Sequence, residues 1–282
     1  MAQLPFNRPS RLEMLYRAEI KRLLDTYFQF PTFDTLGELT SKLAEFKASI
    51  SFFDQLADRL ARRMITKMAL NNANSWRQAA RTGANGRQIY EMLRGNIGGG
   101  VGLKINQLVH ENSGLIKSLP QRIAGTINHH IYMQFTQGVR SETIMEQIRP
   151  YMHGAKEYQI QRLARTEVAK ADTAITEVRA LDLGLNWYVW KSAHDARVRK
   201  SHKLMNDVLV QWNDPPSPEL LVGEKFEGRY PAGGVFNCRC VALPLVRVEQ
   251  ISFPVRIYIN GSIMRMGYAQ FVGISGLRKL AA

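Results

Sequence analysis

The first 150 residues place apolar side chains at steps of three and four, which is the period of an amphipathic helix. The longest such run falls between residues 35 and 68, at Leu36, Leu39, Leu43, Phe46, Ile50, Phe53, Leu56 and Leu60. The same spacing predicts helices over residues 11–28, 75–94, 103–118 and 121–137, with a break at Asn71, Asn72 and Asn74. Stripes of this kind are typical of helix packing, so the pattern predicts a mostly helical N-terminal part.

Helical spacing continues beyond residue 140. A short helix is expected to begin at Ser141, a suitable N-cap, and to end between Pro150 and Gly154. A longer helix is expected over residues 155–183, where the apolar residues again form one stripe. Gly184 suits its C-terminal stop, because glycine readily takes the left-handed conformation that ends many helices.

The pattern changes to that of strands after Gly184. The run of residues 187–190 consists of strong strand formers, Trp187-Tyr188-Val189-Trp190. A short helix is expected over residues 197–205, a loop rich in proline and glycine over residues 207–234, and a second strand over residues 238–246. The apolar residues between Ile251 and Ile259, followed by Gly261, could form a hairpin.

These patterns predict an α+β chain in three parts. They are a helical domain over residues 1–150, a small α+β domain over residues 151–247 and a basic C-terminal tail over residues 248–282, which could dock on a neighbouring chain. With 45% hydrophobic residues the chain can bury a sizeable core. No run approaches 18 uninterrupted apolar residues and Met1–Ser10 lacks an apolar stretch, so neither a transmembrane helix nor a secretory signal is expected.

The net charge of the chain indicates a polyanionic partner. The chain has 38 Lys and Arg against 24 Asp and Glu, a formal net charge of +14. A protein this basic is attracted to polyanions, and DNA is the commonest of these in a cell or a virus particle. Five basic side chains lie close to one another in the C-terminal motifs and are candidates for phosphate contacts: Arg197, Arg199, Lys200, Lys203 and Arg239. The alternative is that some of them bridge to Asp195, Glu167 and the backbone.

The two cysteines of the chain stand one residue apart, as Cys238-Arg239-Cys240. A disulfide between such close positions would be strained. Zinc prefers thiolate and imidazole ligands, and His202, with His194 or Asp195 as a fourth ligand, would complete such a site. The alternatives are two small thiols half-buried on a strand, or a nucleophilic Cys–His pair whose thiolate is favoured by Arg239. We expect a structural role for a metal here, since no general base can be identified.

Three short motifs occur in a fixed order along the C-terminal half. They are Ala164-Arg165-Thr166-Glu167, then Trp190 with Asp195, Arg197, Val198, Arg199 and His202, and finally Cys238-Arg239-Cys240. This succession resembles the phage head morphogenesis family typified by phage Mu protein F-like minor head proteins, over about residues 140–246. One departure is Met205-Asn206-Asp207, where the family often has glycine; asparagine tolerates a left-handed turn, so the departure is mild.

The resemblance implies a non-enzymatic minor head (capsid) protein of a tailed bacteriophage, with residues 1–150 as a helical docking domain on the portal or capsid side and residues 151–247 as its Mu F-like domain. Such a protein associates with the portal and acts in head assembly, DNA packaging or DNA ejection. The implied partners are the portal protein, the major capsid protein and double-stranded DNA bound non-specifically, with no membrane. The implied location is the capsid interior near the portal vertex, in few copies, and the host cytoplasm during assembly. The alternative function is a metal-dependent nuclease or another enzyme in the C-terminal domain.

Arg165, Glu167, Trp190 and Asp195 are expected to hold the motifs together rather than to react. Arg165 and Glu167 are two residues apart on a helix and therefore face different directions. We expect each to reach a different element, and Arg165 to pair with an acidic residue of the later loop.

Overall fold

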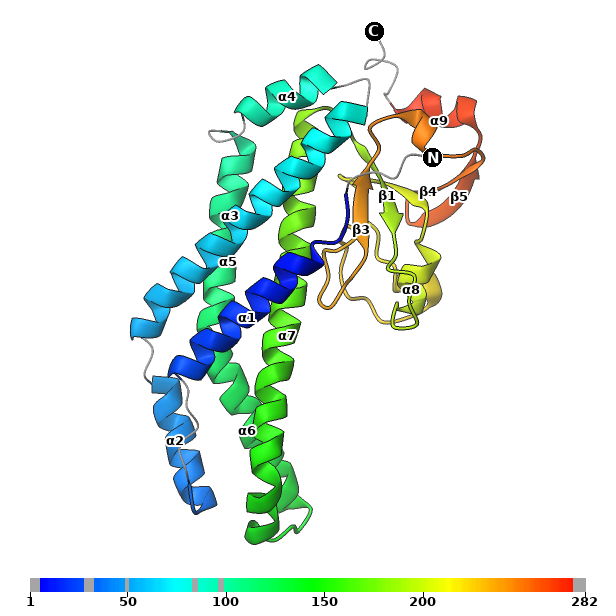
Figure 1. Ribbon diagram of the computed structural model, residues 1–282. Coiled ribbons are helices and arrows are strands. Elements are labelled where there is room, and N and C mark those ends of the chain that lie inside the picture. The colour runs from blue at the N-terminus through cyan, green and yellow to red at the C-terminus, as the bar shows by residue number, and fades with distance from the viewer. Residues whose placement is uncertain (1–5, 28–32, 49–50, 83–85, 96–98, 276–282) are drawn as a thin grey trace. The chain divides into compact units, whose positions relative to one another are not determined.

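The computed structural model describes residues 6–27, 33–48, 51–82, 86–95 and 99–275. It confirms an α+β chain, helical in its N-terminal part, with a five-stranded sheet toward its C-terminus (Figure 1). The helices that precede the sheet are α1 (Ser10–Tyr27), α2 (Leu36–Ala48), α3 (Ser51–Thr82), α4 (Gly86–Gly95), α5 (Gly100–Lys117), α6 (Leu119–Thr136) and α7 (Ser141–Asp182). The elements that follow are β1 (Trp187–Lys191), α8 (Lys200–Leu204), β2 (Val208–Gln211), β3 (Val241–Pro244), β4 (Val255–Ile259), β5 (Ser262–Met266) and α9 (Tyr268–Ser275).

The chain divides into two compact units that do not follow chain order. The helical unit comprises Arg11–Ile65 and Gln107–Arg165, and the sheet unit comprises Met1–Ser10, Thr66–Asn106 and Thr166–Ala282. The points of division fall at the start of α1 and inside α3, α5 and α7. The predicted division by role at residues 150 and 247 stays a prediction.

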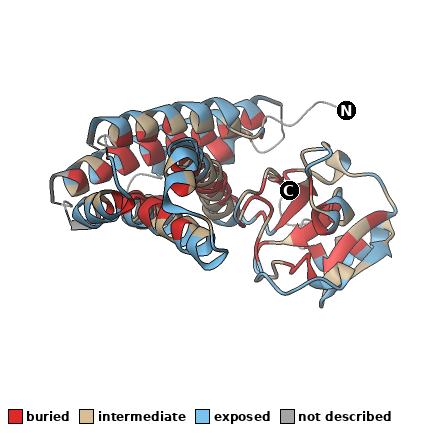
Figure 2. Ribbon diagram, turned by 90° about the horizontal axis from the view of Figure 1, so that it is seen from below, coloured by how far each residue is buried: buried red, intermediate tan, exposed pale blue. Residues whose placement is uncertain are grey.

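Each helix of the helical unit buries one side and exposes the other (Figure 2). On α1, for example, Tyr16, Ile20 and Leu24 are buried at steps of four. Glu157 on α7 accepts hydrogen bonds from Lys21 and, at 3.1 Å, from Arg17, so polar pairs complete the packing of α1 on α7. The amphipathic periodicity read from the sequence is therefore the periodicity of burial.

Two predicted helix boundaries are wrong, and both for reasons of packing. The helix α3 runs through the asparagines, because the buried amide of Asn72 donates to Asp172 Oδ1 at 3.0 Å and to Thr176 Oγ1 at 2.6 Å. These bonds offset the low helix propensity of asparagine. The helix α7 passes through Pro150 without ending, since it buries Ile148, Met152 and Ala155 around that point.

The sheet has the strand order β3-β1-β2-β4-β5. The central strand β1 pairs antiparallel with both β2 and β3, while β2 pairs parallel with β4. Both faces of β1 are buried, which explains its uninterrupted run of aromatic and aliphatic residues.

Each face of the sheet packs into its own apolar cluster. One face contributes Tyr188, Trp190 and Val210 to a large cluster. That cluster also contains Phe6, Trp76, Ala79, Ala80 and Ile89 from segments far earlier in the chain. The other face places Trp187, Val189 and Leu209 against Phe271 of α9. The core of the sheet therefore extends well outside residues 155–246.

The hairpin predicted near the C-terminus is confirmed as β4 and β5, joined at Asn260 and Gly261. Both turn residues have positive φ, 50° and 81°, which is typical of a tight hairpin turn. Within the described residues of this segment, β4 joins this chain's own sheet, and Val255 and Ile257 lie in its second cluster; docking of the tail on a neighbouring chain stays a prediction.

Candidate metal centre

Three of the predicted metal ligands come together in the sheet unit. His202 Nδ1 lies 3.5 Å from Cys238 Sγ and 3.4 Å from Cys240 Sγ, and the three ligand atoms all fall within 4.8 Å of one another. All three side chains are buried and neither thiol is in a disulfide. We call this set the Cys/His group; it contains the donor types that zinc prefers.

Local structure brings these ligands together from segments 36 residues apart. The short helix α8 presents His202, and both cysteines lie in the turn that leads into β3. Asn237 takes a left-handed conformation at φ 56°, and its backbone N–H donates to Thr166 Oγ1 on α7 at 3.0 Å. The backbone N–H of Cys240 donates a hydrogen bond to Cys238 Sγ at 3.4 Å. Thr166, flanked by the two residues that the sequence singled out, thus anchors the cysteine turn.

A second layer of buried polar groups surrounds the histidine. Tyr230 Oη lies 3.1 Å from His202 Nε2 and donates to both carboxylate oxygens of Glu219, at 2.6 and 2.7 Å. Glu219 Oε1 also lies 3.5 Å from Nε2 and accepts from Ser201 Oγ at 3.4 Å. Sequence analysis missed Glu219 and Tyr230, because single residues in a loop carry no periodic or spacing signal.

The thiols of the Cys/His group differ in acidity. A hydrogen bond from the Cys240 thiol, together with the neighbouring His202, holds the pKa of Cys238 well below its usual value. The same bond to Cys238, together with burial, raises the pKa of Cys240, although the nearby Trp190 indole acts to lower it. The buried Trp190 Nε1 has no hydrogen-bond acceptor in the described structure. A thiolate at Cys240 would be such an acceptor, so the surroundings fit a site in which both thiols are deprotonated.

His194, the fourth predicted ligand, is not part of the group. It is exposed, with a left-handed φ of 53°, on the loop after β1. Among the described His, Cys, Asp and Glu residues, the group that could hold a metal ion consists of His202, Cys238 and Cys240. Asp195, the alternative fourth ligand, instead accepts two hydrogen bonds from Arg239, one of them at 2.6 Å.

The five basic residues predicted to contact phosphate have different environments. The Arg239 side chain is only 9% exposed and forms the bidentate pair with Asp195. Arg199 donates to the carbonyl of Phe236 at 3.1 Å and covers that ring. Arg197, Lys200 and Lys203 are exposed. Arg199 and Arg239 therefore follow the alternative prediction, in which some of the basic side chains bridge to Asp195 and to the backbone.

The remaining motif residues have structural contacts. Trp190 is fully buried and meets the His202 ring edge-on at 5.4 Å between centroids. Arg165 Nε bonds Glu13 on α1 at 3.3 Å, so the expectation of a partner in the later loop is wrong. Glu167 is buried and lies 3.6 Å from Lys170 Nζ. The left-handed residue at the family's glycine position is Asp207, at φ 60°, rather than Asn206.

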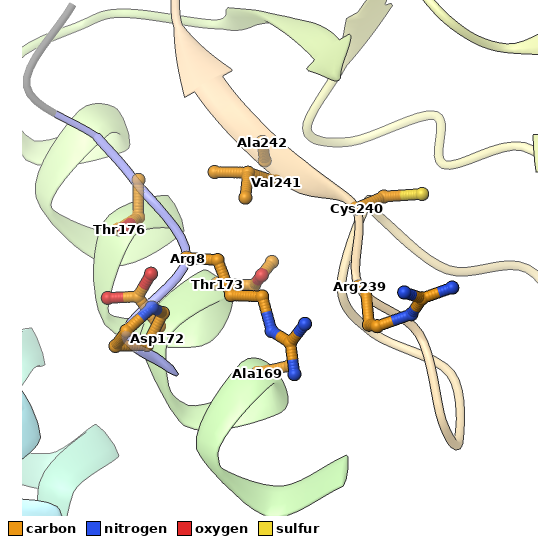
Figure 3. Close-up of a pocket in the computed structure, with 10 residues that line it drawn as sticks. Arg8, Ala169, Asp172, Thr173, Thr176, Arg239, Cys240, Val241 and Ala242 are labelled. Atoms are coloured by element: carbon orange, nitrogen blue, oxygen red, sulfur yellow. The ribbon is translucent and has the colours of Figure 1, made fainter. Parts of the chain in front are cut away.

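A small pocket lies beside the Cys/His group, between α7 and β3 (Figure 3). Arg8, Asp172, Thr173 and Thr176 line it, and so does Cys240. In Figure 3 the thiol of Cys240 points away from Asp172 and Arg8.

The fold and the site define an α+β protein with a buried candidate metal centre. Residues 125–243 match the family model described as Phage Mu protein F like protein. This segment, which contains His202, Cys238 and Cys240, is therefore similar to the phage Mu protein F-like family, whose match points to a phage head-related protein.

An uncharacterized protein of Haemophilus influenzae is 27% identical over 143 residues, which cover 51% of this chain and 30% of that protein. The alignment therefore spans less than a third of the length of the relative. No solved structure matches the chain. Within the described residues, no helix is long and apolar enough to cross a membrane.

Proposed function

We propose that this protein is a minor head protein of a tailed phage that associates with the portal and acts in head assembly, DNA packaging or DNA delivery. The observation that carries the proposal is the family match over residues 125–243, which includes all three sequence motifs. The proposed partners are the portal protein, the major capsid protein and double-stranded DNA. The proposed location is the capsid interior near the portal vertex, after assembly in the host cytoplasm.

The charge of the chain supports contact with DNA. A net charge of +14 favours a polyanionic partner, and Arg197, Lys200 and Lys203 are exposed for phosphate contacts in the sheet unit. DNA close to the portal would supply a dense array of such phosphates.

Quantitative mass spectrometry of purified virions and of DNA-free procapsids tests this proposal. A minor head protein is expected in both particles, in few copies relative to the major capsid protein, and it should co-sediment with purified portal protein. Absence from both particles, with no binding to portal protein, would refute the proposal.

The Cys/His group favours one alternative function. Zinc sites with three protein ligands commonly keep an open position that can activate water, which would suit a metal-dependent nuclease. Incubation of the purified protein and plasmid DNA with zinc or magnesium separates the two functions. Turnover that is lost in Cys238→Ser would support the enzyme, whereas DNA binding without cleavage is expected of the head protein.

A further inference from the structure

The distances inside the Cys/His group match those of a tetrahedral metal site. Zinc lies about 2.0–2.1 Å from a histidine nitrogen and about 2.3 Å from a thiolate, so tetrahedral geometry separates the nitrogen and sulfur atoms by roughly 3.5 Å. The two separations from His202 Nδ1 are 3.4 and 3.5 Å. Neutral Nδ1 has one lone pair and can accept fully from one thiol only. A cation between the three atoms would satisfy all of them at once.

The hydrogen bonds around Tyr230 determine which nitrogen of His202 carries its proton. The Tyr230 hydroxyl has one hydrogen, which is directed to the Glu219 carboxylate at 2.6 and 2.7 Å. Toward His202 Nε2, at 3.1 Å, the same oxygen can therefore only accept. Nε2 must then carry the proton, which leaves the lone pair of Nδ1 directed at the two sulfur atoms.

This arrangement of carboxylate, hydroxyl and imidazole resembles the outer layer of many metal sites. A histidine that binds metal through one nitrogen usually donates from the other to a carboxylate, a carbonyl or water, which fixes the ring and its tautomer. Here Glu219 is buried and acts on His202 through Tyr230, which is also buried. The Cys240 N–H donates to Cys238 Sγ, and the buried Trp190 N–H, which has no other acceptor in the described structure, would be available to a thiolate at Cys240.

We propose that the Cys/His group binds a thiophilic divalent cation of the zinc class, and that Glu219 is a positioning residue which, through Tyr230, holds His202 in the metal-binding tautomer. The inference goes beyond the proposed head function and is independent of it, because it rests on the side chains of the sheet unit alone.

Binding is tested on the full-length protein with Co²⁺ as a spectroscopic probe and Zn²⁺ as its competitor. One equivalent of Co²⁺ is expected to give thiolate-to-cobalt charge-transfer and tetrahedral ligand-field bands, which Zn²⁺ abolishes. Cys238→Ser should weaken binding and reduce the charge-transfer band, whereas Ser192→Ala, on the loop after β1, should change neither. No charge-transfer band, together with metal-free protein as purified, would overturn the metal site.

The positioning role is tested by Tyr230→Phe and Glu219→Gln, with Tyr258→Phe and Glu224→Gln as matched controls. Each test variant is expected to bind Zn²⁺ about 10- to 100-fold more weakly in competition with a chromophoric chelator, while the controls bind as wild type does. Nitrogen-15 NMR of the metal-free protein reports the tautomer: His202 should carry its proton on Nε2 in wild type and should lose this preference in Tyr230→Phe.

Failure of the positioning role can be distinguished from failure of the metal site. Wild-type protein that binds metal, with unchanged affinity and tautomer in Tyr230→Phe, would remove the positioning role and keep the metal site. Should Glu219→Gln not fold, the Tyr230→Phe pair of measurements decides the question, because that substitution keeps the carboxylate and the ring.

Discussion

The carboxyl of Asp172 lies on α7 against Asn72 of α3, where burial makes its negative charge unfavourable. Burial raises the pKa of its carboxyl to about 6, against the opposing hydrogen bond from Asn72. The folded protein therefore holds this proton more tightly than the unfolded chain does, and the free energy of unfolding falls as the pH rises from about 4 to about 6.

We predict that Asp172→Asn increases the free energy of unfolding by about 1 to 3 kcal/mol at pH 7. The amide oxygen can still accept from Asn72, and the cost of the buried charge disappears. At pH 3.8 the carboxyl is protonated in the folded state and half protonated in the unfolded chain, so most of the gain should vanish. Urea denaturation at pH 3.8 and pH 7 measures the difference, and an equal gain at both values would contradict the assignment of the pKa.

Arg239 provides a second prediction, because the structure places it in an ion pair rather than on a binding surface. Its planar guanidinium bonds both oxygens of Asp195, which a lysine ammonium cannot reproduce. Arg239→Lys should lower the melting temperature and leave DNA affinity nearly unchanged. The exposed Lys200→Ala and Lys203→Ala should show the opposite behaviour. Thermal melting and DNA titration on the three variants measure both effects, and a large loss of DNA affinity in Arg239→Lys would count against this division.

The chemistry of the candidate site was predictable where residue types are scarce. Two cysteines one residue apart and a histidine in the preceding motif stand out in any sequence, and they do converge. Glu219 and Tyr230 lie in a loop rich in proline and glycine, and their meeting with His202 depends on the path of that loop. Only the folded chain contains this information.

The helices and strands were predictable to the extent that burial is periodic. Regular apolar stripes located the helices, and the aromatic run located β1. Periodicity could not show that α3 and α7 continue through asparagines and a proline, because contacts from other segments decide those points. The same limitation explains why α3 and α4 were not expected to belong to the core of the sheet.

A substitution of Trp76 on α3 tests whether α3 belongs to the core of the sheet. Its side chain is fully buried and meets the Phe6 ring edge-on at 5.0 Å between centroids. Trp76→Ala should reduce the free energy of unfolding by about 3 to 5 kcal/mol, the usual cost of removing a large aromatic side chain from a core. Chemical denaturation measures the loss, with the exposed neighbour Arg77→Ala as the control. A loss below about 1 kcal/mol would contradict the packing of α3 in this core.

A related prediction concerns the fragment 155–282, which keeps the strands but lacks Phe6, Trp76 and Ile89. It should bind hydrophobic dyes and melt without a cooperative transition, because the face of the sheet that carries Tyr188 and Trp190 has lost part of its cover. Cooperative melting of this fragment, like that of the full chain, would show that the sheet holds its core alone.

For the molecule as a whole, the charge of +14 predicts DNA binding that depends on salt and not on sequence. Contacts to phosphate release counterions, so affinity should fall steeply between about 50 and 200 mM salt. Fluorescence anisotropy with two unrelated duplexes of equal length measures this. Affinity that is constant over that range, or a strong preference for one duplex, would contradict binding through phosphate contacts.

The strand order of the sheet has a consequence for the synthesis of the chain. Val208 of β2 pairs with Arg256 of β4, while β3, made in between, joins the opposite edge of the sheet. At about 5 to 20 residues per second, β2 emerges from the ribosome roughly 2 to 10 seconds before its neighbour exists. During that interval Val208, Leu209 and Val210 form an unpaired apolar edge, the kind of surface on which nascent chains aggregate. The arrival of β4 therefore protects the nascent protein, since this strand covers that edge.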